Sequence, residues 1–525
     1  MSSPDRAAEP PTGVVSDLVG GSVASRVAAG DPALWPGAAW PGWVRAARSA
    51  RPMVGAVSAL GETLRVAGLH RIVLVTTAGV GVAVEGLGVG TAPGTGLIVL
   101  DTADPESVAD VLAGDLDTTA LVTVLPPGAT GPEAESVALV HEVVTEALIA
   151  EGLPAERHTV LIDVPDGPLA RRASGATLLA GPPDVSGLWS SLSAYTLVPA
   201  GLAGADIGVL LAGADVAAAA LAEDSPDNPA LVLGAILAAA PTVALTGTPA
   251  LVEYATELIA GGLGKDGRGP LAVRLDDPDA PLADLVRSAG VPDGALAIEV
   301  AGPVAGTGAA PALVERTDGG PGLRTEGSAA GQVLLWQHAV AVAAHLLAVD
   351  PTHRPAGTRP PADTATAFVD GFVDGAVAVR GGSWLPAGTD TVADALRALV
   401  DPSGAAPTHL AVHAYLDRES DASAAVLRLE LARRTGLTTT FGWAPRCLAG
   451  TGQYDEGGPD APVVCQLTGD AAEPGERPEE LGERQRATAD ADAAALAANG
   501  RRVLRLHFVD RIAGLVTLAK AVQQL

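Results

Sequence analysis

The sequence predicts an α/β protein built on parallel sheets, and three observations support this fold class. Short runs of Val, Ile and Leu recur between Gly and Pro residues, as expected of strands that are buried on both faces. Helical patterns lie between these runs, so that strand and helix alternate along the chain. The 525 residues are 48% hydrophobic, which is enough apolar material for more than one large core. We therefore expect doubly wound sheets with helices on both faces.

The first alternating series follows a segment, residues 1–65, that is loop-rich and then helical. Aliphatic runs predict strands at residues 72–77, 96–101, 120–125, 159–164 and 177–181. Between them, helical patterns cover residues 105–112 and 132–151. We assign residues 66–220 to a first α/β domain.

The second series follows a Pro-rich loop at residues 225–229. It predicts strands at residues 241–247, 271–275, 296–300, 409–416, 438–441, 463–467 and 503–508. Helices are predicted at residues 251–263, 331–349 and 510–524. We assign residues 221–525 to a second α/β domain that ends in C-terminal wrapping segments.

Charge and composition exclude several classes of partner. The formal net charge of −28 opposes binding to nucleic acid or to an anionic membrane, and no basic patch is visible. The longest uninterrupted apolar run, residues 230–240, ends at Pro241 and is too short to cross a bilayer. The first thirty residues lack an apolar signal core, and two cysteines suit a reducing compartment. We therefore expect a cytoplasmic protein with no membrane association.

Motifs for cofactors and metals are missing from the sequence. No GxxxxGK[ST] loop occurs, and the Gly-rich run at residues 79–94 lacks the GxGxxG spacing of a dinucleotide site. His338 and His345 are seven residues apart with no third ligand, which does not make a convincing metal site. We expect neither a metal nor a cofactor.

Residues 446–470 carry the most informative motif, RCLAGTGQYDEGGPDAPVVCQLTGD. This stretch resembles a late segment of the phosphoglucose isomerase (glucose-6-phosphate isomerase) family, in the branch fused to transaldolase, which reads roughly PRxLHSTGQxHKGGPNxGxFLQITxD. Residues 101–108 (DTADPESV), 188–207 and 257–273 resemble further family segments in the same order. The resemblance covers roughly residues 66–525.

The resemblance implies a double sugar-isomerase (SIS) fold, in which two flavodoxin-like halves hold the substrate between them. Members interconvert glucose 6-phosphate and fructose 6-phosphate without a cofactor, so a sugar phosphate is the ligand that it implies. It also implies a homodimer. The reaction needs a phosphate cradle, a carboxylate that moves a proton between two carbons, and a cation that stabilises the oxyanion.

The two phosphate loops of the family are altered in this chain. In the first loop, residues 76–82 (TTAGVGV), Val80 and Gly81 replace two serines. The second loop, residues 126–134 (PPGATGPEA), lacks the lysine and serine of the family. The hydroxyls that remain for a phosphate are those of Thr76, Thr77, Thr130 and Ser190. The alternative is that both loops are plain β-to-α turns.

The two principal catalytic positions are also altered. The family arginine of the GGRxS motif aligns with Leu188, which can neither donate a hydrogen bond nor carry charge. The catalytic glutamate of the ExxGK motif aligns with Gly261, which cannot accept a proton, while Lys265 of the same motif is kept. We therefore expect family activity to be absent or strongly reduced.

Three other residues are candidates for relocated catalysis. Glu257 lies on the helical face of Gly261 but about 6 Å away along the axis. His338 aligns near the ring-opening histidine of the family, and Lys520 lies near a C-terminal catalytic lysine. The ordinary readings are a buried histidine for His338 and a helix-surface lysine for Lys520.

Two hypotheses follow from the resemblance and the substitutions. The chain is either a non-catalytic member that binds a pathway enzyme or a metabolite, or an aldose-ketose isomerase that uses relocated groups.

Overall fold

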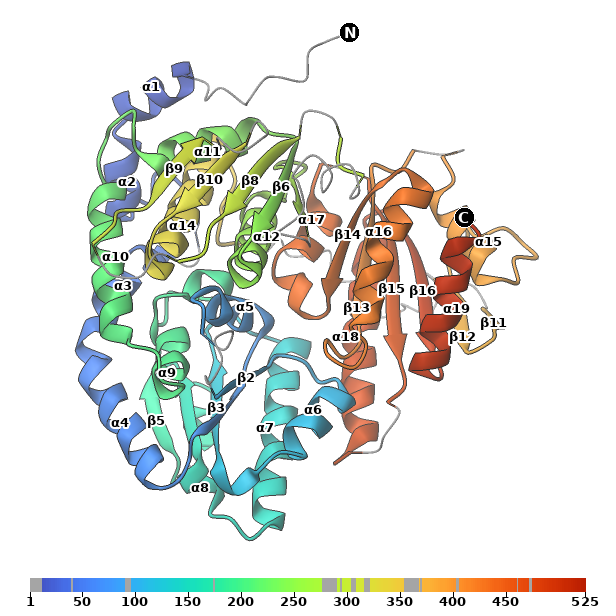
Figure 1. Cartoon of the computed structure of the whole chain (residues 1–525), viewed down its shortest axis with the longest axis horizontal. Helices are drawn as coiled ribbons and strands as arrows, with labels where there is room; N and C mark the ends of the chain where they lie inside the picture. The colour runs from blue at the N-terminus through green and yellow to red at the C-terminus, as the bar shows by residue number, and fades with distance from the viewer. Residues whose placement is uncertain are drawn as a thin grey trace.

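The structure is a computed structural model that describes most of the chain. The described residues are 12–38, 41–89, 96–172, 175–275, 290–292, 295–303, 308–315, 322–353, 368, 371–402, 406–459, 461–471 and 475–525. Three β-sheets, each covered by helices, form the body of the molecule (Figure 1). The α/β class with parallel sheets is therefore confirmed.

The first sheet has the strand order β2-β1-β3-β4-β5, and all of its pairs are parallel. Its strands are β1 (Arg71–Val75), β2 (Leu97–Leu100), β3 (Thr119–Leu125), β4 (Thr159–Asp163) and β5 (Thr177–Ala180). Its helices are α5 (Ala78–Gly86), α6 (Pro105–Leu112), α7 (Pro132–Ala150) and α8 (Ala155–His158). After β1 the chain forms β2 on one side of β1, and it then crosses to form β3 on the other side. The strand order therefore reverses at β1.

The second sheet has the order β7-β6-β8-β10-β9, with β9 antiparallel to β10. Its strands are β6 (Thr242–Gly247), β7 (Leu271–Arg274), β8 (Leu296–Val300), β9 (Ala312–Glu315) and β10 (Leu323–Glu326). The helices that surround it are α10 (Ile207–Leu221), α11 (Pro229–Ala239), α12 (Pro249–Leu263) and α14 (Ala329–Leu347), whereas α9 (Ala194–Leu202) contacts β1 and β3 of the first sheet. Helix α14 packs against α10, α11 and α12 at the centre of the largest core.

One described helix, α14, has the length and hydropathy of a membrane span. This differs from the expectation that no segment reaches that length. Its most apolar window is 83% buried inside the protein, as in the core helix of a folded domain.

The third sheet has the order β11-β12-β16-β15-β13-β14. Its strands are β11 (Phe372–Asp374), β12 (Val377–Arg380), β13 (His409–Tyr415), β14 (Thr438–Trp443), β15 (Val463–Gly469) and β16 (Arg502–Phe508). The four strands β13 to β16 pair in parallel, and the β11–β12 hairpin adds an antiparallel edge.

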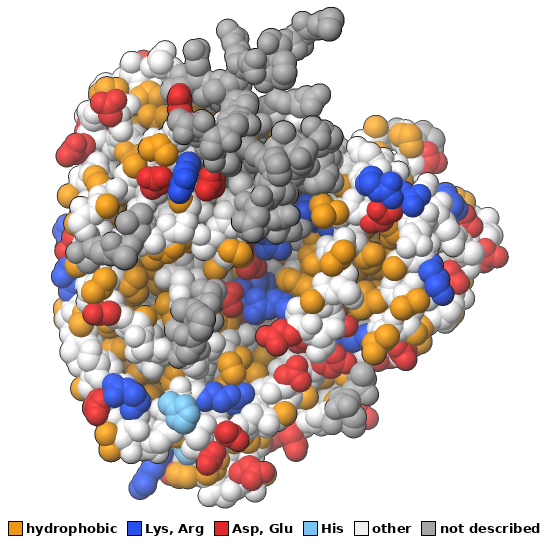
Figure 2. All heavy atoms as spheres, in the orientation of Figure 1, with side chains coloured by type: hydrophobic (Ala, Val, Ile, Leu, Met, Phe, Trp, Pro, Cys, Tyr) orange, Lys and Arg blue, Asp and Glu red, His pale blue; other side chains and the backbone are white. Residues whose placement is uncertain are grey.

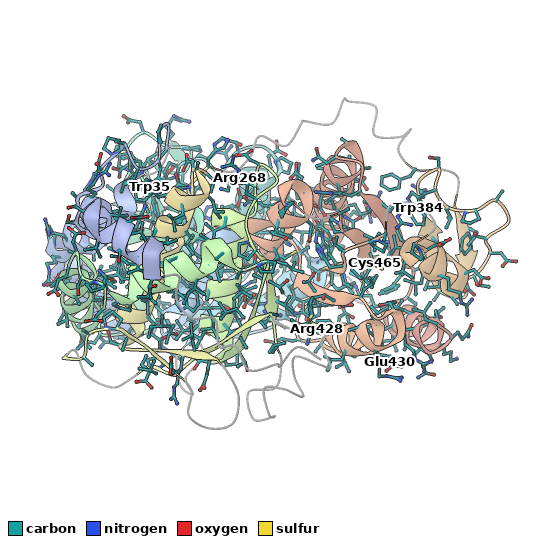
Figure 3. All side chains as sticks on the ribbon, turned by 90° about the horizontal axis from the view of Figure 1, so that it is seen from above. Trp35, Arg268, Trp384, Arg428, Glu430 and Cys465 are labelled. Carbon is teal, nitrogen blue, oxygen red and sulfur yellow. The ribbon has the colours of Figure 1, made fainter. Side chains whose placement is uncertain are left out.

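Helices cover both faces of this third sheet. They are α15 (Val392–Val400), α16 (Ser423–Thr435), α17 (Thr451–Gly457), α18 (Pro478–Ala498) and α19 (Arg511–Gln523). Leu410 and Val412 of β13 point into a core with α15, α16 and α19, whereas Ala411 between them packs with α18 on the other face. The segments expected to wrap around a second half thus form a sheet with cores of their own. Figure 3 labels Cys465 of β15 and Trp35 in opposite halves of the molecule.

The described part of the N-terminal segment is mostly helical. It consists of α1 (Thr12–Gly20), α2 (Val23–Ala29), η1 (Pro41–Arg45), α3 (Ala46–Ala50), η2 (Arg51–Met53) and α4 (Val54–Val66). Trp35 and Trp43 are buried, and Trp35 Nε1 donates to Ala341 O of α14 over 3.0 Å. The segment therefore clamps the helical core of the second sheet from outside. The predicted domain bounds, 1–65, 66–220 and 221–525, remain predictions.

Candidate functional site

A cavity of about 370 Å³ lies between the first and third sheets, and we call it the switch-point cavity. One wall comes from the carboxyl ends of β1 and β3 and from α7, and the other from α18 and the turn at residues 445–449. Ligands of open α/β sheets bind at such a reversal of strand order. Figure 2 shows a hollow between the parts of the molecule that hold these sheets, with charged side chains gathered around it.

Three of the predicted phosphate-binding residues meet in this cavity. Thr76 and Thr77 follow β1, Thr130 follows β3, and all three line the cavity. The Thr76 hydroxyl donates to Val124 O over 3.2 Å. Ser190 is separate from them: it is fully buried, does not line the cavity, and donates to Gly187 O over 2.7 Å.

Asp101 occupies the space beside the first loop. A Cβ atom at Gly81, which aligns with a family serine, would lie 2.2 Å from Asp101 Oδ2. Glycine at this position therefore makes room for the carboxylate, and a serine would collide with it. Burial raises the pKa of Asp101, while Arg446, whose Nη2 lies 2.9 Å from Oδ2, opposes that rise.

The described lining of the cavity carries acidic but no basic side chains. Asp101, Glu133, Glu456 and Asp492 all contribute to it. No Lys, Arg or His is among the described residues that form its walls. A dianion placed here would meet these carboxylates, because Arg446 and His413, which contact Asp101 and Asp492, are not part of the described cavity surface.

Asp492 belongs to a buried network of alternating carboxylates and imidazoles. His413 of β13 bridges two carboxylates, with Nδ1 3.2 Å from Asp492 Oδ2 and Nε2 2.9 Å from Asp455 Oδ2. His409 Nε2 lies 2.8 Å from the other oxygen of Asp455. Gln466 Nε2 also donates to Asp492 Oδ2, over 3.2 Å. The network thus fixes the orientation of a side chain on the cavity wall.

The charges of this network are set by mutual contact. Burial alone would lower the pKa of His413, but Asp492 and Asp455 raise it to about 10. Burial would raise the pKa of Asp455, but the hydrogen bonds from His409 and His413 lower it to about 2. His413 is therefore an imidazolium at neutral pH, and Asp455 is ionised.

Arg446 is a buried cation at the junction of the sheets. It makes two hydrogen bonds to Glu85, of 2.6 and 3.2 Å, and also lies near Asp101 and Glu253. Burial would lower its pKa, but the pairing with Asp101, Glu253 and Glu85 raises it. Arg446 lines a second cavity, of about 210 Å³, that shares Asp101 and Pro445 with the first. Its charge is already balanced by three acids.

Gly261 and Leu188 stand where the resemblance places the catalytic glutamate and arginine. A Cβ at Gly261 would lie 2.7 Å from Ala449 O and 3.1 Å from Gly450 Cα. The backbone of the 445–450 turn therefore fills the space that a side chain at this position needs. Leu188 is 5% exposed within the core.

Glu257 is engaged as a structural acceptor. Its carboxylate receives hydrogen bonds from Thr451 N (2.8 Å) and Thr451 Oγ1 (3.0 Å), at the start of α17. Burial raises its pKa to about 8, although the Thr451 amide counteracts this. The cavity beside it measures about 20 Å³, which holds little more than one water molecule. Glu257 does not line the switch-point cavity.

His338 and Lys520 also lie apart from that cavity. His338 is 4% exposed, packs edge-on against Trp43 with ring centroids 5.4 Å apart, and has its pKa lowered to about 4 by burial. Lys520 is exposed in the last turn of α19. The structure therefore brings together none of the three candidates for relocated catalysis.

Lys265, kept from the ExxGK motif, has a structural role. Its ammonium group donates to the carbonyls of Asp350 (3.0 Å) and His353, where it ties the end of α12 to the segment after α14. Burial lowers its pKa to about 8.

Sequence reasoning did not single out Arg446, His413 or Asp492. Arg446 opens the recognised motif, and Asp455 stands within it where the family has a histidine. A carboxylate at a position that the fold buries needs a partner, and this need was the signal available in the sequence. No group of three His, Cys, Asp or Glu side chains suited to a metal occurs among the described residues.

The fold and the cavity define a class: an α/β protein with a flavodoxin-like first sheet and a ligand-sized space at its point of strand reversal. A solved structure, that of a hypothetical protein from Thermus thermophilus, shares the fold with a TM-score of 0.54 and 20% identity. The match covers 66% of this chain and 93% of that one. No protein-family model matches the sequence.

Curated relatives confirm the resemblance found in the sequence. The chain is 37% identical over 190 residues to the "Probable glucose-6-phosphate isomerase" of Haloarcula marismortui, covering 34% of this chain and 42% of the relative. It is 33% identical over 204 residues to the protein of the same name from Haloquadratum walsbyi, covering 36% and 46%. Over about a third of its length this chain is thus similar to proteins named glucose-6-phosphate isomerase, and the match spans less than half of those relatives' length.

Proposed function

We propose that this protein is a glucose-6-phosphate isomerase homologue that acts by binding and has lost most or all of the isomerase reaction. The observation that carries the proposal is the packing of Gly261 against Ala449 and Gly450. The position of the family base has no side chain, and the backbone leaves no room for one. Each acid–base group typically contributes about a hundredfold or more to the rate.

The electrostatics of the site support the same proposal. With Leu188 at the arginine position, the nearby buried cation Arg446 is paired with Glu85 and Asp101. An oxyanion that developed in the switch-point cavity would find no free cation among the described residues of its lining. As part of the proposal, the protein is a cytoplasmic homodimer that binds a metabolite or a partner enzyme of sugar-phosphate metabolism.

The test is a coupled assay of the purified full-length protein with fructose 6-phosphate. Glucose 6-phosphate formation is followed with a dehydrogenase, and an ordinary glucose-6-phosphate isomerase is the positive control. We expect no rate above the enzyme-free background. Turnover within about a hundredfold of the positive control would overturn the proposal. In a thermal-shift assay, 6-phosphogluconate should leave Tm unchanged because the cavity lining is acidic.

A second candidate function is isomerisation by relocated residues. The raised pKa of Glu257, about 8, favours it, because such a value suits a general acid or base. Against it stand the small space beside Glu257 and its two hydrogen bonds to Thr451. If turnover is found, its loss in Glu257→Ala would select this function.

A further inference from the structure

We propose that the switch-point cavity binds a polyhydroxylated ligand that carries an ammonium group and no phosphate, an unphosphorylated amino sugar being the simplest example. The inference rests on the proposed function, since it concerns what the altered site holds in place of the family substrate. It follows from the position, charge, orientation and size of the cavity.

The acidic side chains of the lining favour a ligand with a positive charge. Carboxylates come from both walls: Glu133 is on α7, and Asp492 is on α18. Ionised carboxylates only accept hydrogen bonds, so the ligand must supply donors. An ammonium group supplies three donors and the opposite charge, and it suits this lining better than a hydroxyl does.

Asp492 is the acceptor best prepared to receive such a group. Its side chain is 8% exposed, and its contacts with His413 and Gln466 both go to Oδ2. The carboxylate is therefore held in one orientation by β13 and β15 while it lines the cavity. An acceptor fixed before binding loses little conformational freedom when the ligand arrives.

The rest of the cavity suits a sugar-sized polyol. Thr76, Thr77, Thr130 and Ser136 offer hydroxyls, and Val137, Val140 and Leu448 add apolar surface. A volume of about 370 Å³ falls at the lower end of the range for small-molecule sites.

A phosphate would be disfavoured at the place where the family loop holds one. Asp101 Oδ2 lies against Gly81 in the space that a serine side chain would need. A dianion beside this carboxylate would be repelled, with Arg446 already bonded to Glu85.

Calorimetric titration of the full-length protein tests the inference with four matched probes. They are D-glucosamine, D-glucose, glucosamine 6-phosphate and glucose 6-phosphate, compared at about pH 6.5 so that the amines are protonated. We expect glucosamine to bind at least about tenfold tighter than glucose, and each phosphate ester to bind more weakly than its parent sugar. Failure of glucosamine to bind at millimolar concentration, or tighter binding of either ester, would overturn the inference.

A matched pair of variants locates the binding. Asp492→Asn should weaken glucosamine binding by about tenfold, whereas Asp490→Asn should leave it unchanged, because Asp490 pairs with Arg505 outside the cavity. If Asp492→Asn does not fold, as judged by circular dichroism, Glu133→Gln takes its place. Its control is Glu135→Gln, two residues away on α7 and absent from the lining. Equal binding by the test variant and its control would refute the assignment.

The two proposals fail separately. Turnover of fructose 6-phosphate would overturn the proposed function, whether or not glucosamine binds. Absence of glucosamine binding without turnover would remove only the present inference.

Discussion

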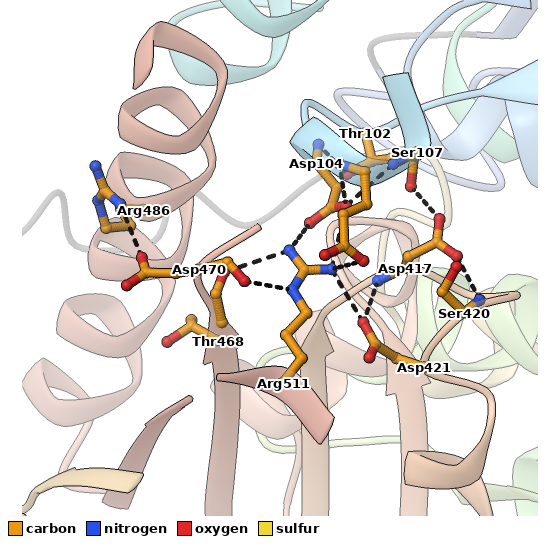
Figure 4. Close-up of polar contacts among 12 residues, drawn as sticks. Thr102, Asp104, Ser107, Asp417, Ser420, Asp421, Thr468, Asp470, Arg486 and Arg511 are labelled. Carbon is orange, nitrogen blue, oxygen red and sulfur yellow. Dashed lines mark hydrogen bonds and ion pairs between the residues drawn. The ribbon is translucent and has the colours of Figure 1, made fainter. Parts of the chain in front are cut away.

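Arg511 Nη2 donates to Asp104 Oδ2 over 2.6 Å and so joins the first residue of α19 to the residue that caps α6. Arg511 also contacts Glu106 and Asp421, at 3.1 and 3.0 Å, and its Nε donates to Asp470 O (Figure 4). Its side chain is 2% exposed. One guanidinium group therefore holds the third sheet against the first, beside the space that separates them.

Replacement of Arg511 should loosen this junction. Arg511→Met would leave Asp104 and Asp421 buried without their cation, so we expect the free energy of unfolding to fall by about 3–5 kcal/mol. Arg65→Met, which breaks an exposed pair with Glu62, should change it by less than about 1 kcal/mol. Urea unfolding followed by circular dichroism measures both. Similar losses of unfolding free energy in the two variants would contradict the role of Arg511 in holding the third sheet against the first.

Restoring the family glutamate should not restore activity. Gly261→Glu would push a side chain against Ala449 O, so we expect a loss of stability of about 3 kcal/mol or more and no turnover. Gly55→Glu on α4 is the control, because nothing lies within 4 Å of a Cβ there. Thermal unfolding and the coupled assay give the two readouts. A stable Gly261→Glu protein with isomerase activity would show that the backbone of the 445–450 turn can move to accommodate the new side chain.

Stability should fall as the pH rises through the titration of His413. Its pKa is about 10 in the folded protein, above the ordinary value of 6.5, so the folded state binds the extra proton. The resulting stabilisation is complete below about pH 6.5 and is lost as the pH approaches 10. His413→Asn should flatten this dependence by on the order of a few kcal/mol, while His70→Asn, at an exposed histidine, should not. Unfolding free energies between these pH values decide the matter; parallel curves for wild type and His413→Asn would disprove the ion pairing.

Glu257 should behave as a neutral structural group rather than as a base. Because its folded pKa of about 8 exceeds the ordinary 4.5, its contribution is present at low pH and is lost as the pH rises through 8. Glu257→Gln stays uncharged, so it should gain stability relative to wild type between about pH 5 and 9. Glu135→Gln, at an exposed carboxylate, should show no such gain. If the difference in unfolding free energy between Glu257→Gln and wild type is the same at about pH 5 and about pH 9, Glu257 is ionised throughout this range.

The long buried strands were predictable because continuous aliphatic runs leave few alternatives. The runs at 120–125 and 159–164 correspond to β3 (Thr119–Leu125) and β4 (Thr159–Asp163), and the helix at 105–112 matches α6. The short strands β9 and β10 and the β11–β12 hairpin were not predicted. Their sequences mix exposed polar and apolar residues, and they are the outermost two strands of their sheets, where burial on both faces no longer marks them.

The candidate site was predictable only where it depends on single loops. Thr76, Thr77 and Thr130 follow strands that end side by side, and so they meet at one edge. Asp492 and His413 are 79 residues apart on different elements. Their contact depends on how α18 crosses the third sheet, which no local pattern records.

The two walls of the switch-point cavity come from distant parts of the chain, residues 75–140 and residues 445–495. A protein cut between the second and third sheets would keep the threonines and lose the carboxylate that faces them. Occupancy of the cavity therefore reports that the parts of the chain on the two sides of this cut are assembled, and a bound ligand would add to the contact that Leu481 of α18 makes with the core of the first sheet.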